Sequence, residues 1–184
     1  MNALVKTQGK PLVGTTAAQA NAEEKQYLTF MLGGEVFAIG ILGIKEIIEY
    51  AGLTEVPMMP ACIRGVINLR GAVVPVMDLS SRFGKASTAV TKRSCIVIVE
   101  VATEAQDSLV MGVVVDAVNA VLEIPASEIE PAPAFGAKIR TDFIEGMGKV
   151  NGKFVILLNV NRVLSVEEIG AMGQPAEVER LLPA

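Results

Sequence analysis

The stretch IRGVINLRGAVVPVMDL, residues 63–79, decides the fold class of this chain. Apolar and β-branched residues fill most of its positions, and Gly71 interrupts them near the centre. Because glycine adopts the positive φ of a tight turn without steric penalty, residues 66–79 predict a β-hairpin that turns at Gly71. Pro75 has no backbone N–H, so its strand should lie at a sheet edge or carry a bulge.

Two further hairpins are predicted outside this stretch, where turn dipeptides separate short apolar runs. Gly33-Gly34 and Asn151-Gly152 both favour the positive φ angles of a two-residue turn. The chain between these hairpins adds two more apolar runs of strand length. The strands predicted in this way are 27–32, 36–39, 95–101, 109–115, 144–150 and 154–160.

Other segments predict short helices. In Ile41–Tyr50, the isoleucines at 41, 44 and 48 recur at helical spacing with charged residues between them. Asp116–Leu122 has a similar pattern. A terminal helix is predicted within residues 165–182, where Ser165 is placed to act as its N-cap.

The two halves of the chain resemble each other. Val36–Ile39 aligns with Val110–Val113, and without a gap Ile44 meets Val118 and Ile47 meets Val121. After a short insertion the match resumes at Gly65 with Gly146, Gly71 with Gly152, and Asp78-Leu79 with Asn159-Val160. A unit of about five short strands, repeated once, predicts two small β-barrels packed together. The alternative is that two β-rich segments of similar composition align by chance.

The composition excludes several function classes. The 184 residues include no histidine, which removes Ser-His-Asp and Cys-His catalysis and the commonest metal ligand. The net charge of −4 without a basic stripe argues against nucleic-acid binding. No P-loop or dinucleotide motif occurs, so we expect no cofactor and no metal. No apolar run approaches the length of a membrane helix, and Cys62 and Cys95 fit a reduced cytoplasmic location.

A carboxylate-dependent hydrolase stays open as a remote alternative, because four acidic residues lie near predicted strand or helix ends and two of them could act as acid and base. A third interpretation is an uncommitted small barrel without a partner. The four acidic residues are Asp78, Glu100, Asp116 and Glu123.

Five segments together resemble the CheW family of chemotaxis coupling proteins. The pattern R-G-V-x-N-L-R-G, followed by an apolar run with proline and then Asp-Leu, is highly specific for this family. The resemblance covers about residues 25–167. The segments are QYLTFMLGGEVF (26–37), IGILGIKEII (39–48), IRGVINLRGAVVPVMDL (63–79), MGVVVDAV (111–118) and EGMG (145–148).

The resemblance implies a mainly β fold of two SH3-like, five-stranded barrels with short helices and a C-terminal helix. It implies a non-catalytic adaptor that joins the cytoplasmic tips of methyl-accepting receptors to the histidine kinase CheA. A helical receptor tip would bind in a groove between the barrels, and the kinase would contact one barrel end near Arg64 and Gly65. The receptor-binding positions implied are Ile44, Glu46, Asn68, Arg70, Val73 and Val121.

Three segments follow from this organisation. Residues 1–24 are expected to be a flexible tail, 25–167 the CheW-like domain with two intertwined barrels divided near 84–94, and 168–184 a terminal helix or tail. The protein would be cytoplasmic and recruited to receptor arrays at the inner face of the membrane, without inserting into it. An alternative is that it serves another chemosensory array, such as one that controls twitching or surface behaviour.

Overall fold

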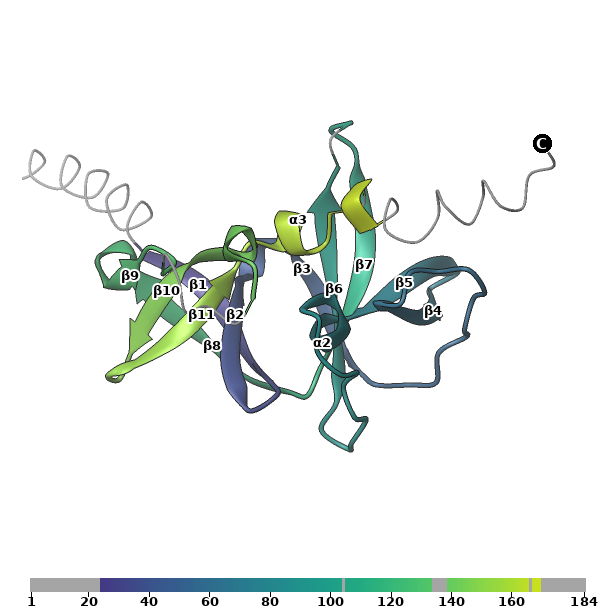
Figure 1. The fold of residues 1–184 in the computed structure, drawn as a ribbon, viewed down its shortest axis with the longest axis horizontal. Coiled ribbons are helices and arrows are strands. Elements are labelled where there is room, and N and C mark those ends of the chain that lie inside the picture. The colour runs from purple at the N-terminus through teal and green to yellow at the C-terminus, as the bar shows by residue number, and fades with distance from the viewer. Residues whose placement is uncertain (1–23, 104, 134–138, 166, 170–184) are drawn as a thin grey trace, which may run out of the picture.

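A computed structural model describes residues 24–103, 105–133, 139–165 and 167–169. Its strands form two sheets that appear as two lobes, with the short helix α3 over the seam (Figure 1). We name the sheet of order β8-β1-β2-β11-β10-β9 barrel A and the sheet of order β3-β6-β7-β5-β4 barrel B. The strands are β1 (Glu24–Leu32), β2 (Glu35–Gly40), β3 (Ile44–Glu49), β4 (Ile63–Leu69), β5 (Ala72–Asp78), β6 (Cys95–Ala102), β7 (Ser108–Val115), β8 (Ala117–Pro125), β9 (Ile129–Glu130), β10 (Ile144–Val150) and β11 (Lys153–Leu158).

The sequence repeat is confirmed by the strand order. The alignment equates β1 to β5 of the first half, leaving aside the two-residue β9, with β6, β7, β8, β10 and β11 of the second half. Substituting these equivalents turns β8-β1-β2-β11-β10 into β3-β6-β7-β5-β4, the order observed in barrel B. The parallel pair β2–β11 likewise matches the parallel pair β7–β5. Apart from β9, which is the sixth strand of barrel A, each barrel therefore takes two strands from one repeat and three from the other.

The interior divides into three apolar clusters. Along β6, Ile96 and Ile98 pack inside barrel B, whereas Val97, Val99 and Val101 pack in a larger cluster between the barrels. Alternate residues of a strand point to opposite faces, so a strand that is buried on both faces needs a continuous apolar run. The same alternation on β1 and β2 fills the smaller interior of barrel A. The inter-barrel cluster thus packs the two SH3-like barrels against each other.

Each repeat ends in an equivalent helical turn. Helix α2 (Leu79–Arg82) follows β5, and helix α3 (Val160–Val163) follows β11. The side chain of Asp78 accepts a hydrogen bond from the N–H of Ser81, and Asn159 does the same for Arg162. Such N-caps satisfy a backbone N–H that the first helical turn leaves unpaired. The matched Asp-Leu and Asn-Val pairs of the repeat are therefore helix starts.

The two internal helices predicted from periodicity are wrong. Only Ile41–Gly43 is helical, as a single 3-10 turn (η1), and β3 follows it; Asp116–Leu122 likewise belongs mostly to β8. Residues Ile44 and Ile48 are four apart, a spacing that places them on one face of a helix, whereas in β3 a register shift between Ile44 and Glu46 turns Ile44 toward the inter-barrel cluster and Ile48 toward the interior of barrel B. The β-branched side chains and the pairing of β3 with β6 decide for the strand.

The predicted hairpins are confirmed, and the structure shows how Pro75 fits. Strand β5 lies inside barrel B rather than at its edge. Opposite Pro75, Val66 directs both its N–H and its carbonyl to Thr54, away from β5, at 2.9 and 3.0 Å. The ring nitrogen of Pro75 therefore faces away from β4, and the pairing of β5 with β7 begins only at Val76. No ladder bond is lost at the proline.

The expected segment boundaries need correction. Strand β1 begins at Glu24, inside the predicted tail, and residues 1–23 lie outside the described residues. Residues 84–94 separate the two repeats but connect α2 to β6 within barrel B, so the barrels are not divided there. At the C-terminus the N–H of Glu168 donates to Ser165 Oγ at 3.2 Å, which confirms the predicted N-cap. The predicted helix beyond residue 169 lies outside the described residues.

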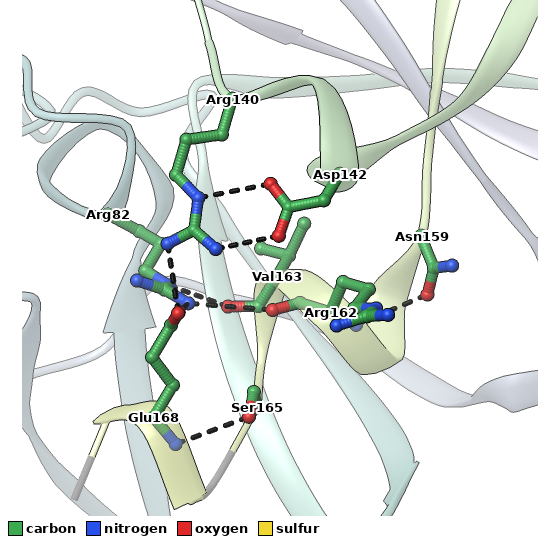
Figure 2. Close-up of polar contacts among 8 residues, drawn as sticks. All are labelled: Arg82, Arg140, Asp142, Asn159, Arg162, Val163, Ser165 and Glu168. Carbon is green, nitrogen blue, oxygen red and sulfur yellow. Dashed lines mark hydrogen bonds and ion pairs between the residues drawn. The ribbon is translucent and has the colours of Figure 1, made fainter. Parts of the chain in front are cut away.

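A cluster of charges braces the two barrels across the seam (Figure 2). Arg82 of α2, whose side chain is 2% exposed, donates from Nε to the carbonyl of Val163 at 2.7 Å and also binds the carboxylate of Glu168. Arg140 binds the same carboxylate and forms two hydrogen bonds to Asp142. Both guanidinium groups lie over the ring of Phe143, at 4.7 and 4.4 Å. These contacts of Arg82 and Arg140 hold α3 and the start of the C-terminal segment in place.

Replacing Gly71 by valine should lower the free energy of unfolding by about 1–2 kcal/mol, the cost of left-handed backbone for a residue with a Cβ. Gly71 has φ +86°, and an added Cβ would meet nothing within 4 Å, so the cost is conformational rather than steric. Urea denaturation measures the change. Ala72→Val, one residue later in extended strand, is the matched control, and equal midpoints for both variants would contradict the prediction.

Candidate functional site

A groove of about 780 Å³ lies between the two barrels. Strands β1, β8 and β10 and helix α3 line it from barrel A, and β6 lines it from barrel B. The η1 turn that joins the barrels projects Leu42, which is 100% exposed, at this groove. Val99 and Leu158 form an apolar floor, and carboxylates stand at the rim. The lining residues include Lys25, Ile41, Leu42, Glu100, Glu123, Glu145 and Val160.

Two of the expected receptor-binding residues flank this groove. Ile44 follows η1, pairs with Val99 of the groove floor and packs against the inter-barrel cluster. Val121 is 52% exposed and pairs with Leu28, which is buried in the same cluster. Directly opposed residues in an antiparallel pair project to the same face, so both side chains point toward the seam. Ile44 belongs to β3 of barrel B, and Val121 belongs to β8 of barrel A.

Ile47 was missed by the sequence analysis as a surface residue. It is 42% exposed and pairs with Val97, a residue of the inter-barrel cluster. The repeat equates Ile47 with Val121, so the two edge strands β3 and β8 expose matching apolar side chains. That alignment was the signal in the sequence that could have identified it.

Glu46, Asn68 and Arg70 form a separate network at the β4–β5 turn. The Arg70 guanidinium makes two hydrogen bonds to the Glu46 carboxylate, one of 3.0 Å. Asn68 Oδ1 accepts from the Gly71 N–H at 2.9 Å and so holds the turn. The hydrogen bond from Arg70 lowers the pKa of Glu46 below its ordinary value, and the attraction between the charges adds to this. Glu46 therefore lies on strand β3 and connects this strand to the β4–β5 turn.

Val73 lies opposite Asn68 in the β4–β5 pair and is 71% exposed. Its counterpart in the repeat is Phe154 of β11, which is 50% exposed and was also missed by the sequence analysis. Large apolar side chains at this exposure are typical of contact surfaces when they cluster. The structure thus places the six expected receptor-binding residues on two surfaces, the seam and the β4–β5 turn.

The residues expected at the kinase contact have structural partners. Arg64 Nη1 binds Asp78 at 2.9 Å and the carbonyl of Thr88 at 2.8 Å. Its guanidinium also lies 5.6 Å from the centre of the Tyr50 ring. A Cβ added at Gly65 would lie 2.5 Å from the carbonyl oxygen of Thr54. Both residues hold the connection 50–62 and the linker after α2 in place, and their role toward the kinase stays a prediction.

The four carboxylates of the hydrolase alternative lie in different surroundings. Asp78 is buried in its ion pair with Arg64 and caps α2, and Asp116 accepts from the Gly33 N–H at 2.8 Å. Glu100 and Glu123 both line the groove, from opposite barrels. A hydrogen bond from Ser108 and the charge of Lys45 lower the pKa of Glu100, whereas a general acid needs a raised pKa.

Comparison with known proteins identifies the class. The model of the CheW-like domain family matches residues 26–168, so the chain belongs to this family. The chain is 34% identical to the solved scaffolding protein TtCheW from Thermoanaerobacter tengcongensis, with a TM-score of 0.67, covering 76% of this chain and 91% of that one. This likeness confirms the two-barrel fold. Among the described residues, none forms a helix with the length and apolar character needed to cross a membrane.

Curated relatives carry matching names. The chain is 32% identical to the chemotaxis protein CheW of Klebsiella aerogenes, over 90% of this chain and 93% of the relative. It is 34% identical to the chemotaxis protein CheW of Bacillus subtilis, over 82% and 92%. Protein FrzA of Myxococcus xanthus is 29% identical, over 80% and 89%. The chain is thus a member of the family of chemotaxis coupling proteins.

Proposed function

We propose that this chain is a non-catalytic adaptor that couples methyl-accepting chemotaxis receptors to the histidine kinase CheA. The observation that carries the proposal is the groove between the two packed barrels, which has an apolar floor and an exposed Leu42. The protein would act in the cytoplasm, in receptor arrays at the inner face of the membrane. Coupling then means that the adaptor transmits a difference in binding free energy between kinase states without performing chemistry.

The receptor would bind as a helix in a groove. An amphipathic helix buries an apolar ridge, and Leu42, Ile44 and Val121 offer apolar area on both sides of the seam. The ion pair between Glu46 and Arg70 lies on the separate surface at the β4–β5 turn. It would contact another part of the partner and select its register, since charges at the edge of an interface influence specificity more than affinity. Asn68 supports this pair by holding the turn.

The kinase would contact an end of barrel B near Arg64 and Gly65, and Val73 would extend the receptor surface along β5. The ion pair of Arg64 with Asp78 supports a rigid surface there, because it ties β4 to the end of β5 and to the linker. A rigid surface suits an adaptor, because a partner then binds without an additional cost of ordering the loop.

Co-sedimentation tests the proposal. Purified protein is mixed with receptor cytoplasmic fragments, the kinase, or both, and the pellet is scored for each component. The expected result is a ternary complex in which the kinase pellets with receptor only when this chain is present. Binding to neither partner would contradict the proposed function.

Arg70→Glu should weaken receptor co-sedimentation about tenfold or more while the melting temperature stays close to that of the unmodified protein. The change places two carboxylates together at the β4–β5 turn, and the side chain of Arg70 is 75% exposed, so the fold loses little. The exchange variant Glu46→Arg/Arg70→Glu restores the pair as a control and should recover part of the binding. Unfolding of Arg70→Glu would instead show that Arg70 is structural.

A second candidate is coupling in a different chemosensory array, such as one that controls surface behaviour. The likeness to protein FrzA, which carries a name other than CheW, favours keeping this candidate. A pull-down from the native host distinguishes the two, because the receptors and the kinase that are recovered belong to one array or the other.

A further inference from the structure

The rim of the inter-barrel groove is acidic. Glu100 comes from barrel B, and Glu123 and Glu145 come from barrel A, and all three are exposed. Lys25 is the cationic side chain among the residues that line the groove in the described part of the chain. The groove therefore combines an apolar floor with excess negative charge at its edge.

The two carboxylates on barrel A are available to a partner. Glu100 is already occupied, because its carboxylate lies 3.7 Å from Lys45 Nζ. Within the described residues, the carboxylates of Glu123 and Glu145 form no side-chain hydrogen bond and no ion pair. Burial raises the pKa of Tyr27, and the negative charge of Glu145 raises it further, so this charge acts on the groove wall.

The repeat indicates that these carboxylates are not needed by the fold. Glu145 is the counterpart of Arg64, which in barrel B is fixed by Asp78 and Thr88. Glu123 is the counterpart of Glu49, which is exposed on β3. The same architecture therefore forms with a bonded arginine at the first position and, at the second, with a glutamate whose side chain has no bonded partner in the described part of the chain. An unpaired charge on a groove wall is expected to contribute to partner selection.

We propose that the groove selects an amphipathic helix whose apolar ridge is flanked by lysine or arginine, and that Glu123 and Glu145 recognise these cations. This inference rests on the proposed function, because it assigns a chemistry to the helix that the groove binds. The apolar floor disfavours a wholly basic peptide, and the carboxylates disfavour a helix with acidic flanks, since like charges at an interface reduce affinity.

Fluorescence anisotropy with synthetic helical peptides tests the inference on the full-length protein. Two labelled peptides share one leucine ridge and carry either lysines or glutamates beside it. The lysine-flanked peptide should bind, with an affinity that falls as salt is added. Glu123→Gln/Glu145→Gln should weaken its binding about threefold to tenfold, the sum expected for two exposed ion pairs, and should flatten the salt dependence.

Glu49→Gln is the matched control, because it removes the equivalent carboxylate from β3 outside the groove lining. It should leave peptide affinity unchanged. Equal binding of the two peptides, no binding of the lysine-flanked peptide, or an equal effect of the control and the double variant would each overturn the inference. If the unmodified protein and the double variant both pellet with receptor equally well, the inference fails while the proposed function stands.

Discussion

Replacing Arg82 by methionine should lower the free energy of unfolding by about 3 kcal/mol, because it leaves the buried carbonyl of Val163 without its charged donor and removes a partner of Glu168. The carbonyl of Val163 loses its 2.7 Å hydrogen bond, and the carboxylate of Glu168 loses one of two guanidinium partners. Methionine keeps apolar contact with the ring of Phe143, so the loss reports mainly the polar contacts. The melting temperature should fall by roughly 6–12 °C.

Arg140→Met provides the matched control for this prediction. Arg140 lies over the same ring and binds the same carboxylate, but its side chain is 49% exposed. Water replaces its contacts, so the expected loss is only about 1 kcal/mol. Equal losses from the two variants, measured by chemical denaturation, would show that burial of Arg82 across the seam adds nothing.

Gly65→Ala should be nearly as damaging, with a loss of about 2–3 kcal/mol, because the added Cβ cannot be accommodated without a shift of backbone. The methyl carbon would lie 2.5 Å from the carbonyl oxygen of Thr54 and 3.2 Å from Cβ of Leu53. The paired hydrogen bonds between Thr54 and Val66 anchor this connection to the edge of barrel B, and they must lengthen to make room. Thermal melting measures the loss.

Gly52→Ala lies on the same connection and is the control, since a Cβ there meets nothing within 4 Å. Its melting temperature should stay close to that of the unmodified protein. If Gly65→Ala melts normally yet fails to pellet with the kinase, Gly65 belongs to a contact surface. If it melts early, its loss of kinase binding reports the fold.

The hairpins could be predicted from local sequence because their turns depend on a few residues. Arg70 and Gly71 have φ angles of 53° and 86°, and Asn151 and Gly152 have 52° and 79°. Glycine and Asn151 tolerate the left-handed region whatever surrounds them, whereas Arg70 adopts it inside a turn that the hydrogen bond from the Gly71 N–H to Asn68 Oδ1 closes. The repeat was predictable partly for the same reason, because Gly71, Gly152 and the cap residues Asp78 and Asn159 each serve a local geometry. Gly65 and Gly146 instead allow a close approach of another segment of the chain.

The secondary structure of residues 41–50 and 116–122, which lie mostly in β3 and β8, could not be assigned from the local sequence. A spacing of four suits both a helix face and a strand face, and neither segment is long enough for propensity to decide. The neighbouring strands β6 and β1 decide it, since each offers an unpaired edge to which the segment can hydrogen bond. Pairing partners distant in the chain therefore override the local pattern.

The sequence by itself determined the class of fold, its duplication, the turns and the resemblance to coupling proteins, because these depend on residue type and spacing along the chain. Only the tertiary structure decided that the repeats exchange strands between barrels and that Glu46 pairs with Arg70. It also decided that Arg82 reaches across the seam and that Glu123 and Glu145 meet at one groove. These contacts join residues far apart in the chain, so their geometry exists only once both barrels have closed and packed.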